Sequence, residues 1–189
     1  MTQTDPSLSS TEIAQIRAKV SRPIVLIGLM GVGKSSVGKR LAHAIDRDFA
    51  DADSEIELAA QRSISEIFEE FGEDYFRAGE RRVIARLIEE QRGVIATGGG
   101  AFLDAETRAL ILEKAVAVWI DCDIDTLVER TSRRDTRPLL KTGDPREILT
   151  RLAEERGPLY AQAQIRVESM EGPHEETVMQ ILKGLKSWL

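Results

Sequence analysis

The chain alternates between short, continuous apolar runs and longer segments whose apolar residues recur at helical spacing. The runs at 23–28 (PIVLIG), 93–97 (GVIAT) and 115–121 (AVAVWID) are typical of strands buried on both faces of a sheet. Two shorter runs, 48–53 (DFADAD) and 165–168 (IRVE), indicate further strands, the second at a sheet edge. The apolar pattern therefore predicts a sheet whose central strands are covered from both sides.

Helical segments separate these runs, and capping residues mark where several of them begin. Ser9 with Glu12, and Ser63 with Glu66, form the capping-box pattern, and Asp144 precedes a proline suited to the first helical position. The predicted helices are one that begins after Ser9 and those over 34–45, 63–91 with a break at Gly72, 106–114, 125–132, 145 to about 156, and 175–189. Strands alternating with helices predict an α/β fold, with a mostly parallel sheet between helical layers.

Composition and charge narrow the classes of protein to which this fold can belong. The 189 residues carry a net charge of −6, which argues against a general binder of nucleic acids or membrane surfaces. A single cysteine, Cys122, excludes an internal disulfide and fits a reducing compartment. The polar start MTQTDPSLSS has no signal-peptide pattern, and no apolar run approaches the ~20 residues of a membrane span. We expect a cytoplasmic, single-domain protein.

Residues 28–35, GLMGVGKS, match the phosphate-binding pattern G-x-x-x-x-G-K-[ST] between a buried strand and an amphipathic helix. The glycines let consecutive backbone N–H groups point at phosphate oxygens, and the helix N-terminus adds its dipole. Lys34 would reach the β- and γ-phosphates, and the Ser35 hydroxyl would bind Mg²⁺. A chance match in a glycine-rich turn is the weaker alternative. The predicted ATP-binding residues of this loop (the P-loop, 28–36) are Gly31, Val32, Gly33, Lys34, Ser35 and Ser36.

The rest of the sequence limits what the nucleotide is used for. The chain contains no asparagine, so the usual Asn-Lys-x-Asp guanine site of GTPases is impossible, and its size excludes a motor or transporter ATPase. A small-metabolite kinase remains, with a gluconate kinase-like enzyme or a nucleotide-dependent regulatory module without turnover as alternatives.

Three acids are candidates for the chemistry around Mg²⁺ and the acceptor. Asp51 and Asp121 each end a predicted strand, and the residues alone do not choose between them as the metal-associated acid. Asp51 and Asp53 would project to the same side of an extended segment. One carboxylate could then be associated with Mg²⁺ while the other contacts the acceptor hydroxyl. Alternatively, these acids stabilise a helix N-terminus, with Asp53 as its cap.

Arginines and glycines supply further candidates. Arg130 and Arg137 belong to a basic cluster that is either a helix end or a phosphate-covering lid. Arg77 and Arg156 stand apart, as surface residues or as guanidinium groups that hold a carboxylate. Three glycines follow the strand at 93–97, where ligands of open parallel sheets bind. A glycine run there indicates a need for backbone without side chains.

Six motifs occur in the order and spacing found in shikimate kinases: GLMGVGKSSVGKRLA, FADADSEIE, SISEIFEEFGEDYFR, TGGGA, TRPLL and ERGPLY. The resemblance covers residues 23–189 and leaves 1–22 as an extension, either a short helix or partly disordered. It implies a three-layer α/β/α fold similar to nucleoside monophosphate kinases, with a five-stranded parallel sheet, a lid at about 133–145 and a helical substrate-binding region. It also implies transfer of the γ-phosphate of ATP to the 3-hydroxyl of shikimate, on the route to chorismate. We expect a monomer.

Carried over by position, the resemblance also assigns roles to residues. It implies Ser35 as the Mg²⁺ ligand and places Asp51, rather than Asp121, in the metal shell through water. The catalytic residues would be Lys34, Asp53 and Arg137, with Asp53 as base or as orienter of the hydroxyl. Arg137 would reach the nucleotide phosphates and Arg130 would lie near adenine, where SMEGP (169–173) lacks a basic residue found in some members. The shikimate-binding residues would be Asp53, Arg77, Gly98, Gly99, Gly100 and Arg156.

Overall fold

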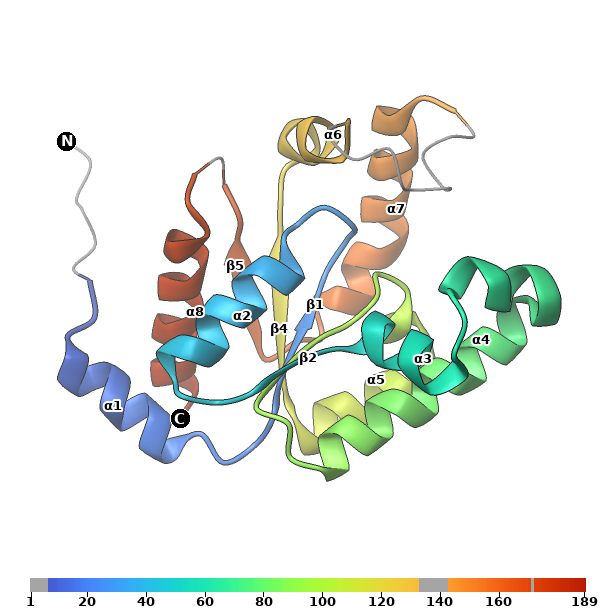
Figure 1. Ribbon diagram of the computed structural model, residues 1–189. Coiled ribbons are helices and arrows are strands. Elements are labelled where there is room, and N and C mark those ends of the chain that lie inside the picture. Colours follow the sequence, from blue (N-terminus) through green and yellow to red (C-terminus); the bar gives the residue numbers. More distant parts are fainter. Residues whose placement is uncertain (1–6, 133–142, 171) are drawn as a thin grey trace.

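Two layers of helices enclose a central sheet in the computed structural model, which describes residues 7–132, 143–170 and 172–189 (Figure 1). The strands are β1 (Ile24–Ile27), β2 (Phe49–Asp51), β3 (Val94–Ala96), β4 (Val116–Asp121) and β5 (Ile165–Glu168). The helices are α1 (Ser10–Lys19), α2 (Lys34–Ala44), α3 (Ala52–Ala60), α4 (Ile64–Glu89), α5 (Ala105–Lys114), α6 (Ile124–Ser132), α7 (Pro145–Tyr160) and α8 (His174–Trp188), with a short 3₁₀ turn η1 (Ala101–Leu103).

The sheet has the order β2-β3-β1-β4-β5, and every strand pair in it is parallel. β1 is the central strand, where Val25 pairs with Ile95 of β3 and with Ala117 of β4. All four residues of β1 are buried, because helices cover both faces of the sheet. This agrees with the continuous apolar run that predicted the strand, and β5 is an edge strand as predicted.

The helices divide between the two faces of the sheet. α1, α2 and α8 pack together on one face, and α4, α5 and α7 lie on the other (Figure 1). α6 follows the end of β4 and contacts α7. Among the residues that the structure describes, no helix is both long and apolar enough to cross a membrane. The strands all point the same way, so their carboxyl ends share one edge of the sheet, where the P-loop begins.

Both predicted capping boxes are present, at Ser9 with Glu12 and at Ser63 with Glu66. Gly72 interrupts α4 with φ of 80° and ψ of 177°, as its position in the sequence predicted. α1 contacts α8, and the Lys186 ammonium donates to the Glu12 carboxylate at 2.7 Å.

Two of the boundaries that differ from the prediction bear on the site. β2 ends at Asp51, and the chain turns into α3 at Ala52, so Asp53 is helical rather than extended. The cap of α3 is Asp51, which accepts N–H groups from Asp53 and Ser54; the idea that Asp53 caps this helix is wrong. α7 also continues past Arg156 to Tyr160 and contains Pro158. Burial of the Tyr160 ring helps to hold that last turn although proline weakens a helix interior.

Candidate active site

The P-loop connects β1 to α2 and presents backbone N–H groups at the sheet edge. Gly31 and Gly33 have φ of 88° and 93°, in the left-handed region that side chains disfavour. Gly33 is the N-cap of α2 and supplies no side-chain acceptor for the N–H groups of the first turn. Backbone N–H groups at the start of a helix point along the helix dipole and bind anions. The predicted phosphate loop therefore has the backbone geometry that phosphate binding needs.

Two side chains of α2 face the start of this loop and the end of β2. The Lys34 ammonium donates to the carbonyl oxygens of Gly28 and Leu29, at 2.7 and 2.9 Å. The Ser35 hydroxyl donates to Asp51 Oδ2 at 2.6 Å. Asp51 is thus held from both sides, because its Oδ1 caps α3. The serine and the carboxylate form a pair of hard oxygen donors beside the loop, the donor type that Mg²⁺ prefers.

Asp121, the other acid at a strand end, has structural partners. Its carboxylate pairs with the Arg166 guanidinium at 2.6 Å and accepts the Cys122 N–H at 2.9 Å. Of the two candidates for the metal-associated acid, Asp51 is the one that contacts Ser35.

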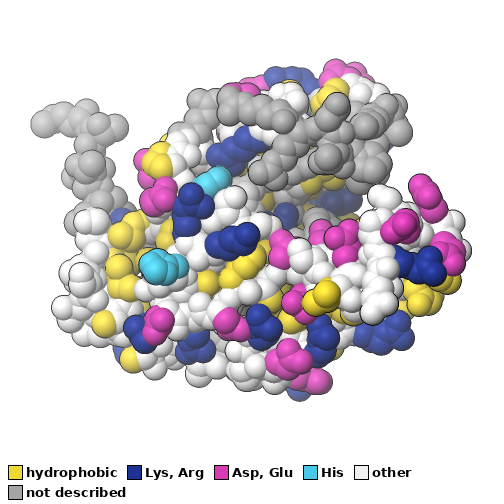
Figure 2. Space-filling view, in the orientation of Figure 1, with side chains coloured by type: hydrophobic (Ala, Val, Ile, Leu, Met, Phe, Trp, Pro, Cys, Tyr) yellow, Lys and Arg dark blue, Asp and Glu magenta, His cyan; other side chains and the backbone are white. Residues whose placement is uncertain are grey.

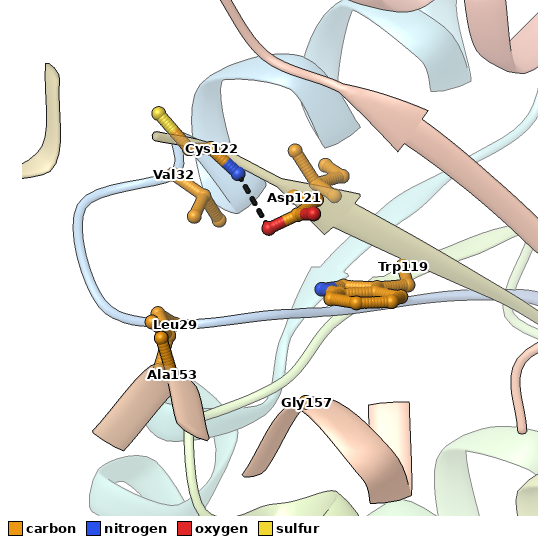
Figure 3. Close-up of a pocket in the computed structure, with 8 residues that line it drawn as sticks. Leu29, Val32, Trp119, Asp121, Cys122, Ala153 and Gly157 are labelled. Atoms are coloured by element: carbon orange, nitrogen blue, oxygen red, sulfur yellow. Dashed lines mark hydrogen bonds between the residues drawn. The ribbon is translucent and has the colours of Figure 1, made fainter. Parts of the chain in front are cut away.

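A pocket of about 190 Å³ opens between the P-loop, the end of β4 and α7. Leu29 and Val32 line it from the loop, Asp121 and Cys122 from β4 and the residue after it, and Gly157 from α7 (Figure 3). None of the predicted shikimate-binding side chains lines this pocket. It adjoins the P-loop, and the residues predicted to bind the acceptor gather elsewhere.

Each of the three consecutive glycines faces one of the predicted acceptor-binding side chains. A Cβ built on Gly98 would lie 2.9 Å from Asp53 Oδ1, and one on Gly99 would lie 3.3 Å from Arg156 Nη1. A Cβ on Gly100 would lie 2.6 Å from Arg77 Nη2. Gly100 has φ of −99°, which any residue adopts, so close approach of side chains explains this glycine better than backbone freedom. The fold thus brings Asp53, Arg77 and Arg156 together around residues 98–100.

Arg77 is fixed by a carboxylate that the sequence analysis did not single out. Its Nη1 donates to Glu80 Oε2 at 2.7 Å, and its Nε and Nη2 lie 3.4 Å from Glu73 Oε1. The side chain of Glu80 is only 3% exposed, so this acid is held inside the protein by its arginine. The i,i+3 spacing of Arg77 and Glu80 on one helix was the available signal.

Arg156 shares its hydrogen-bond acceptor with a tyrosine one turn later in α7. Arg156 Nη1 and the Tyr160 hydroxyl both donate to the Gly99 carbonyl, at 3.0 and 2.5 Å. Tyr160 is 1% exposed, and its ring lies beside those of Phe102 and Trp119. The tyrosine, also missed from the sequence, fixes the backbone of Gly99 to α7.

Burial raises the pKa of two carboxyl groups near residues 98–100, those of Asp53 and Glu80. For Asp53, burial raises the pKa and the charge of Asp51 raises it further, against the opposing influence of Lys34. For Glu80, burial outweighs the effect of Arg77 and also leaves the pKa raised. Burial alone would lower the pKa of Arg77, but Glu80 and Glu73 raise it overall. A carboxylate with a raised pKa is a better proton acceptor, which suits Asp53 to a reacting hydroxyl.

Arg130, the residue predicted to lie near adenine, is held beside the P-loop and the segment after β5. Arg130 donates to Ser169 Oγ at 2.9 Å and to the Met170 carbonyl at 2.7 Å, and it reaches the Val32 carbonyl at 3.4 Å. Arg137 and most of the predicted lid lie outside the described residues. Dark-blue basic side chains over α2 and magenta acidic ones over α3 and α4 flank the region where the strands end (Figure 2).

The parallel sheet, the P-loop and the side chains beyond it define a P-loop kinase with a nucleoside monophosphate kinase-like fold. Comparison with known proteins gives the family, because residues 30–186 match the family model described as shikimate kinase. The chain belongs to the shikimate kinase family. The fold class and the enzyme class predicted from the sequence are confirmed.

The similarity extends over nearly the whole chain. A shikimate kinase of Novosphingobium aromaticivorans is 58% identical over 186 residues, which cover 96% of each chain. One from Caulobacter vibrioides is 58% identical over 177 residues, covering 94% of this chain and 87% of the relative. Among solved structures, a shikimate kinase from Acinetobacter baumannii in complex with shikimate superposes with a TM-score of 0.84 at 33% identity, covering 95% of this chain and 98% of that one.

Proposed function

We propose that this protein transfers the γ-phosphoryl group of ATP to the 3-hydroxyl of shikimate. The observation that supports this acceptor is the grouping of two guanidinium groups, from Arg77 and Arg156, with the Asp53 carboxylate around Gly98–Gly100. Two arginines suit a carboxylate, and a half-buried aspartate suits a hydroxyl of the same small molecule. Gluconate also carries a carboxylate and hydroxyls, so the acceptor needs a direct test.

In the proposed reaction, the acceptor oxygen forms a bond to the γ-phosphorus while the bond from that phosphorus to the bridging oxygen breaks. The electron pair of the broken bond leaves with ADP, and Asp53 accepts or orients the hydroxyl proton. Lys34, with Arg137 of the lid, would neutralise charge on the transferred group. Positioning supplies most of the catalysis, because phosphoryl transfer of this kind needs little covalent assistance from the protein.

Ser35 and Asp51 fit a Mg²⁺ ion that accompanies the nucleotide. Their oxygen atoms lie 2.6 Å apart beside the P-loop, and Asp51 would take part through a water molecule. When bound, the ion would neutralise phosphate charge and orient the phosphates. Ser35 would be the direct ligand.

A coupled assay of ADP release tests the proposal. Shikimate, quinate, gluconate, a nucleoside monophosphate and no acceptor would be compared under the same conditions. ADP release only with shikimate, together with a phosphorus–proton NMR correlation to the carbon-3 proton of the product, supports the proposal. Release with gluconate alone would indicate a gluconate kinase-like enzyme, and no release with any acceptor would favour a regulatory module.

A further inference from the structure

Thr97 lies where the segment that carries the three glycines leaves the sheet. It directly follows β3 and is only 5% exposed. Two donors of this residue share one acceptor, because the Thr97 N–H and the Thr97 hydroxyl both donate to the Leu26 carbonyl of β1, at 3.2 and 2.9 Å. The N–H bond extends the pairing of β1 with β3 by one residue. The hydroxyl bond is an addition that the side chain makes.

The two segments that diverge from this junction carry the two halves of the predicted site. The P-loop begins two residues after Leu26, and the three glycines directly follow Thr97. Beyond the junction the segments still lie against each other, since a Cβ built on Gly99 would lie 3.6 Å from Met30 N and 3.7 Å from the Gly28 carbonyl oxygen. The Leu26 carbonyl is therefore the point on β1 from which both segments set out.

The other hydrogen bonds of the glycine segment lead away from β1. The Gly99 carbonyl accepts from two side chains of α7, and the carbonyls of Gly98 and Gly100 accept N–H groups of the 3₁₀ turn that follows. Among the residues that the structure describes, Thr97 is thus the one through which this segment is hydrogen-bonded to the strand of the P-loop.

Packing alone does not require a hydroxyl at this position. Valine has the same branched shape and favours strands, and the Leu26 carbonyl would keep its N–H partner. A second donor to a paired carbonyl therefore adds little stability, but it restrains the direction in which the chain leaves the strand. That direction matters for in-line transfer, in which the reacting atoms must approach to about 3 to 3.5 Å and a misplacement of about 1 Å can cost about 100-fold in rate.

We propose that Thr97 is a positioning residue, whose hydroxyl sets the placement of the acceptor relative to the nucleotide. The inference rests on the proposed function, because it needs a nucleotide at the P-loop and an acceptor at residues 98–100. It does not depend on which acceptor binds there. Each substrate is held mainly by its own segment, so loss of the hydroxyl slows the transfer step and leaves both binding constants nearly unchanged.

Two substitutions separate the hydroxyl from the bulk of the side chain. Thr97→Val keeps the branched shape, and we expect a near wild-type midpoint of urea denaturation with a transfer rate about tenfold lower. Thr97→Ser keeps the hydroxyl and loses a buried methyl group, so we expect a lower midpoint with a transfer rate within about twofold of the wild type. A side chain that only packs would give the opposite pattern.

The transfer step and the two binding steps are measured separately. Rapid-quench single turnovers, with enzyme in excess over ATP and with saturating shikimate, report transfer without product release. Calorimetry with ADP alone and with shikimate alone gives the dissociation constants, which we expect to stay within about twofold of the wild type. Thr131→Val is the matched control, because the buried Thr131 hydroxyl of α6 donates to the Leu127 carbonyl at 2.7 Å. This control should keep the wild-type transfer rate.

Each alternative result decides against the proposal or for it. A wild-type transfer rate in Thr97→Val overturns the role, as does an equal loss of rate in Thr97→Ser or in the Thr131→Val control. Weaker binding of either substrate with an unchanged transfer rate would show a binding role instead. If the wild type phosphorylates gluconate and not shikimate, the proposed function fails, and the same four proteins test Thr97 with gluconate. Transfer to no acceptor overturns both proposals.

Discussion

The predicted site has a nucleotide side, which is the P-loop, and an acceptor side, which is the group of Asp53, Arg77 and Arg156 around residues 98–100. The two sides are built in different ways. The P-loop is one continuous segment that offers backbone N–H groups and needs glycines with positive φ at Gly31 and Gly33. The acceptor side is made of side chains from separate segments, and its glycines at 98–100 leave space for those side chains. The first side therefore depends on local backbone shape, and the second depends on how distant helices are fixed to the sheet.

The largest effect is expected from a substitution of Asp53, which lies between the P-loop and the three glycines at 98–100. Asp53→Asn keeps the shape of the side chain but removes the proton acceptor, so we expect kcat to fall by about 10²- to 10⁴-fold. ADP affinity should stay close to the wild-type value, because the P-loop is unchanged. Steady-state kinetics with shikimate and calorimetry with ADP measure the two quantities. Wild-type turnover in the variant would refute the role of Asp53.

The same substitution also tests the pH dependence of stability. The pKa of Asp53 is raised in the folded protein, so the ionised carboxylate opposes folding above that pKa. Asp53→Asn should therefore be more stable than the wild type at neutral pH. The gain should shrink as the pH falls through the folded-state pKa and vanish below the unfolded value of about 4. Urea denaturation at several pH values measures this difference, and a constant difference would contradict the expected sign.

Glu80 tests whether the acceptor side depends on its internal charge pairing. Glu80→Ala leaves Arg77 with only the more distant Glu73, and we expect a loss of about 2 to 3 kcal/mol in the free energy of unfolding. The loss is smaller than for a fully buried pair, since the Arg77 side chain is 28% exposed. Glu80→Gln keeps an acceptor and is the matched control, with a smaller loss. Equal stability of wild type and Glu80→Ala in chemical denaturation would show that the pairing is dispensable.

A methyl group at Gly100 should affect the acceptor side alone. In Gly100→Ala the new Cβ would collide with the guanidinium of Arg77, which Glu80 holds in place. We expect the KM for shikimate to rise about tenfold, the equivalent of about 1.4 kcal/mol, with little change in the KM for ATP. Gly79→Ala is the control, because a Cβ there meets nothing within 4 Å and alanine favours a helix. Equal increases in both KM values would place Gly100 outside the acceptor side.

Tyr160 gives the smallest expected effect. Tyr160→Phe keeps the buried ring and removes one of the two donors to the Gly99 carbonyl. Arg156 still holds that carbonyl, so we expect a loss of about 1 kcal/mol in stability and a rise of a few-fold in the KM for shikimate. An unchanged KM for shikimate would show that Arg156 alone positions Gly99.

Sequence patterns predicted what is encoded locally. The continuous apolar runs gave the strands, and the residues at 28–35 gave the P-loop, because each signal lies within a few neighbouring residues. The boundary between β2 and α3 was misjudged, since alternating acids at 51 and 53 suit either a strand or a helix N-terminus. The residues alone did not distinguish Asp51 from Asp121, and the family resemblance favoured Asp51. The fold separates the two acids, because Asp51 caps α3 and contacts Ser35 whereas Asp121 pairs with Arg166.

Residues whose role depends on tertiary contacts escaped sequence reasoning unless the family resemblance named them. Glu80 has the sequence context of an ordinary surface glutamate: its i,i+3 spacing from Arg77 indicates an ion pair, but it does not indicate that the glutamate is buried. Tyr160 follows a proline within a helix expected to end at Arg156, so its contact with Gly99 was hidden by the wrong boundary. The assignments of Arg77 and Arg156 depended on the resemblance, because an isolated arginine on a helix is usually a surface residue.

The central position of β1 has a consequence for synthesis of the chain. β1 precedes the P-loop within the first fifth of the sequence, but its neighbours β3 and β4 are encoded much later. A ribosome must therefore release the chain through Asp121 before β1 is flanked on both sides. Parallel pairing between such distant segments is slow compared with local helix formation. The P-loop is therefore synthesised long before the strands that flank β1, and the apolar β1 segment stays exposed during that interval, which favours aggregation.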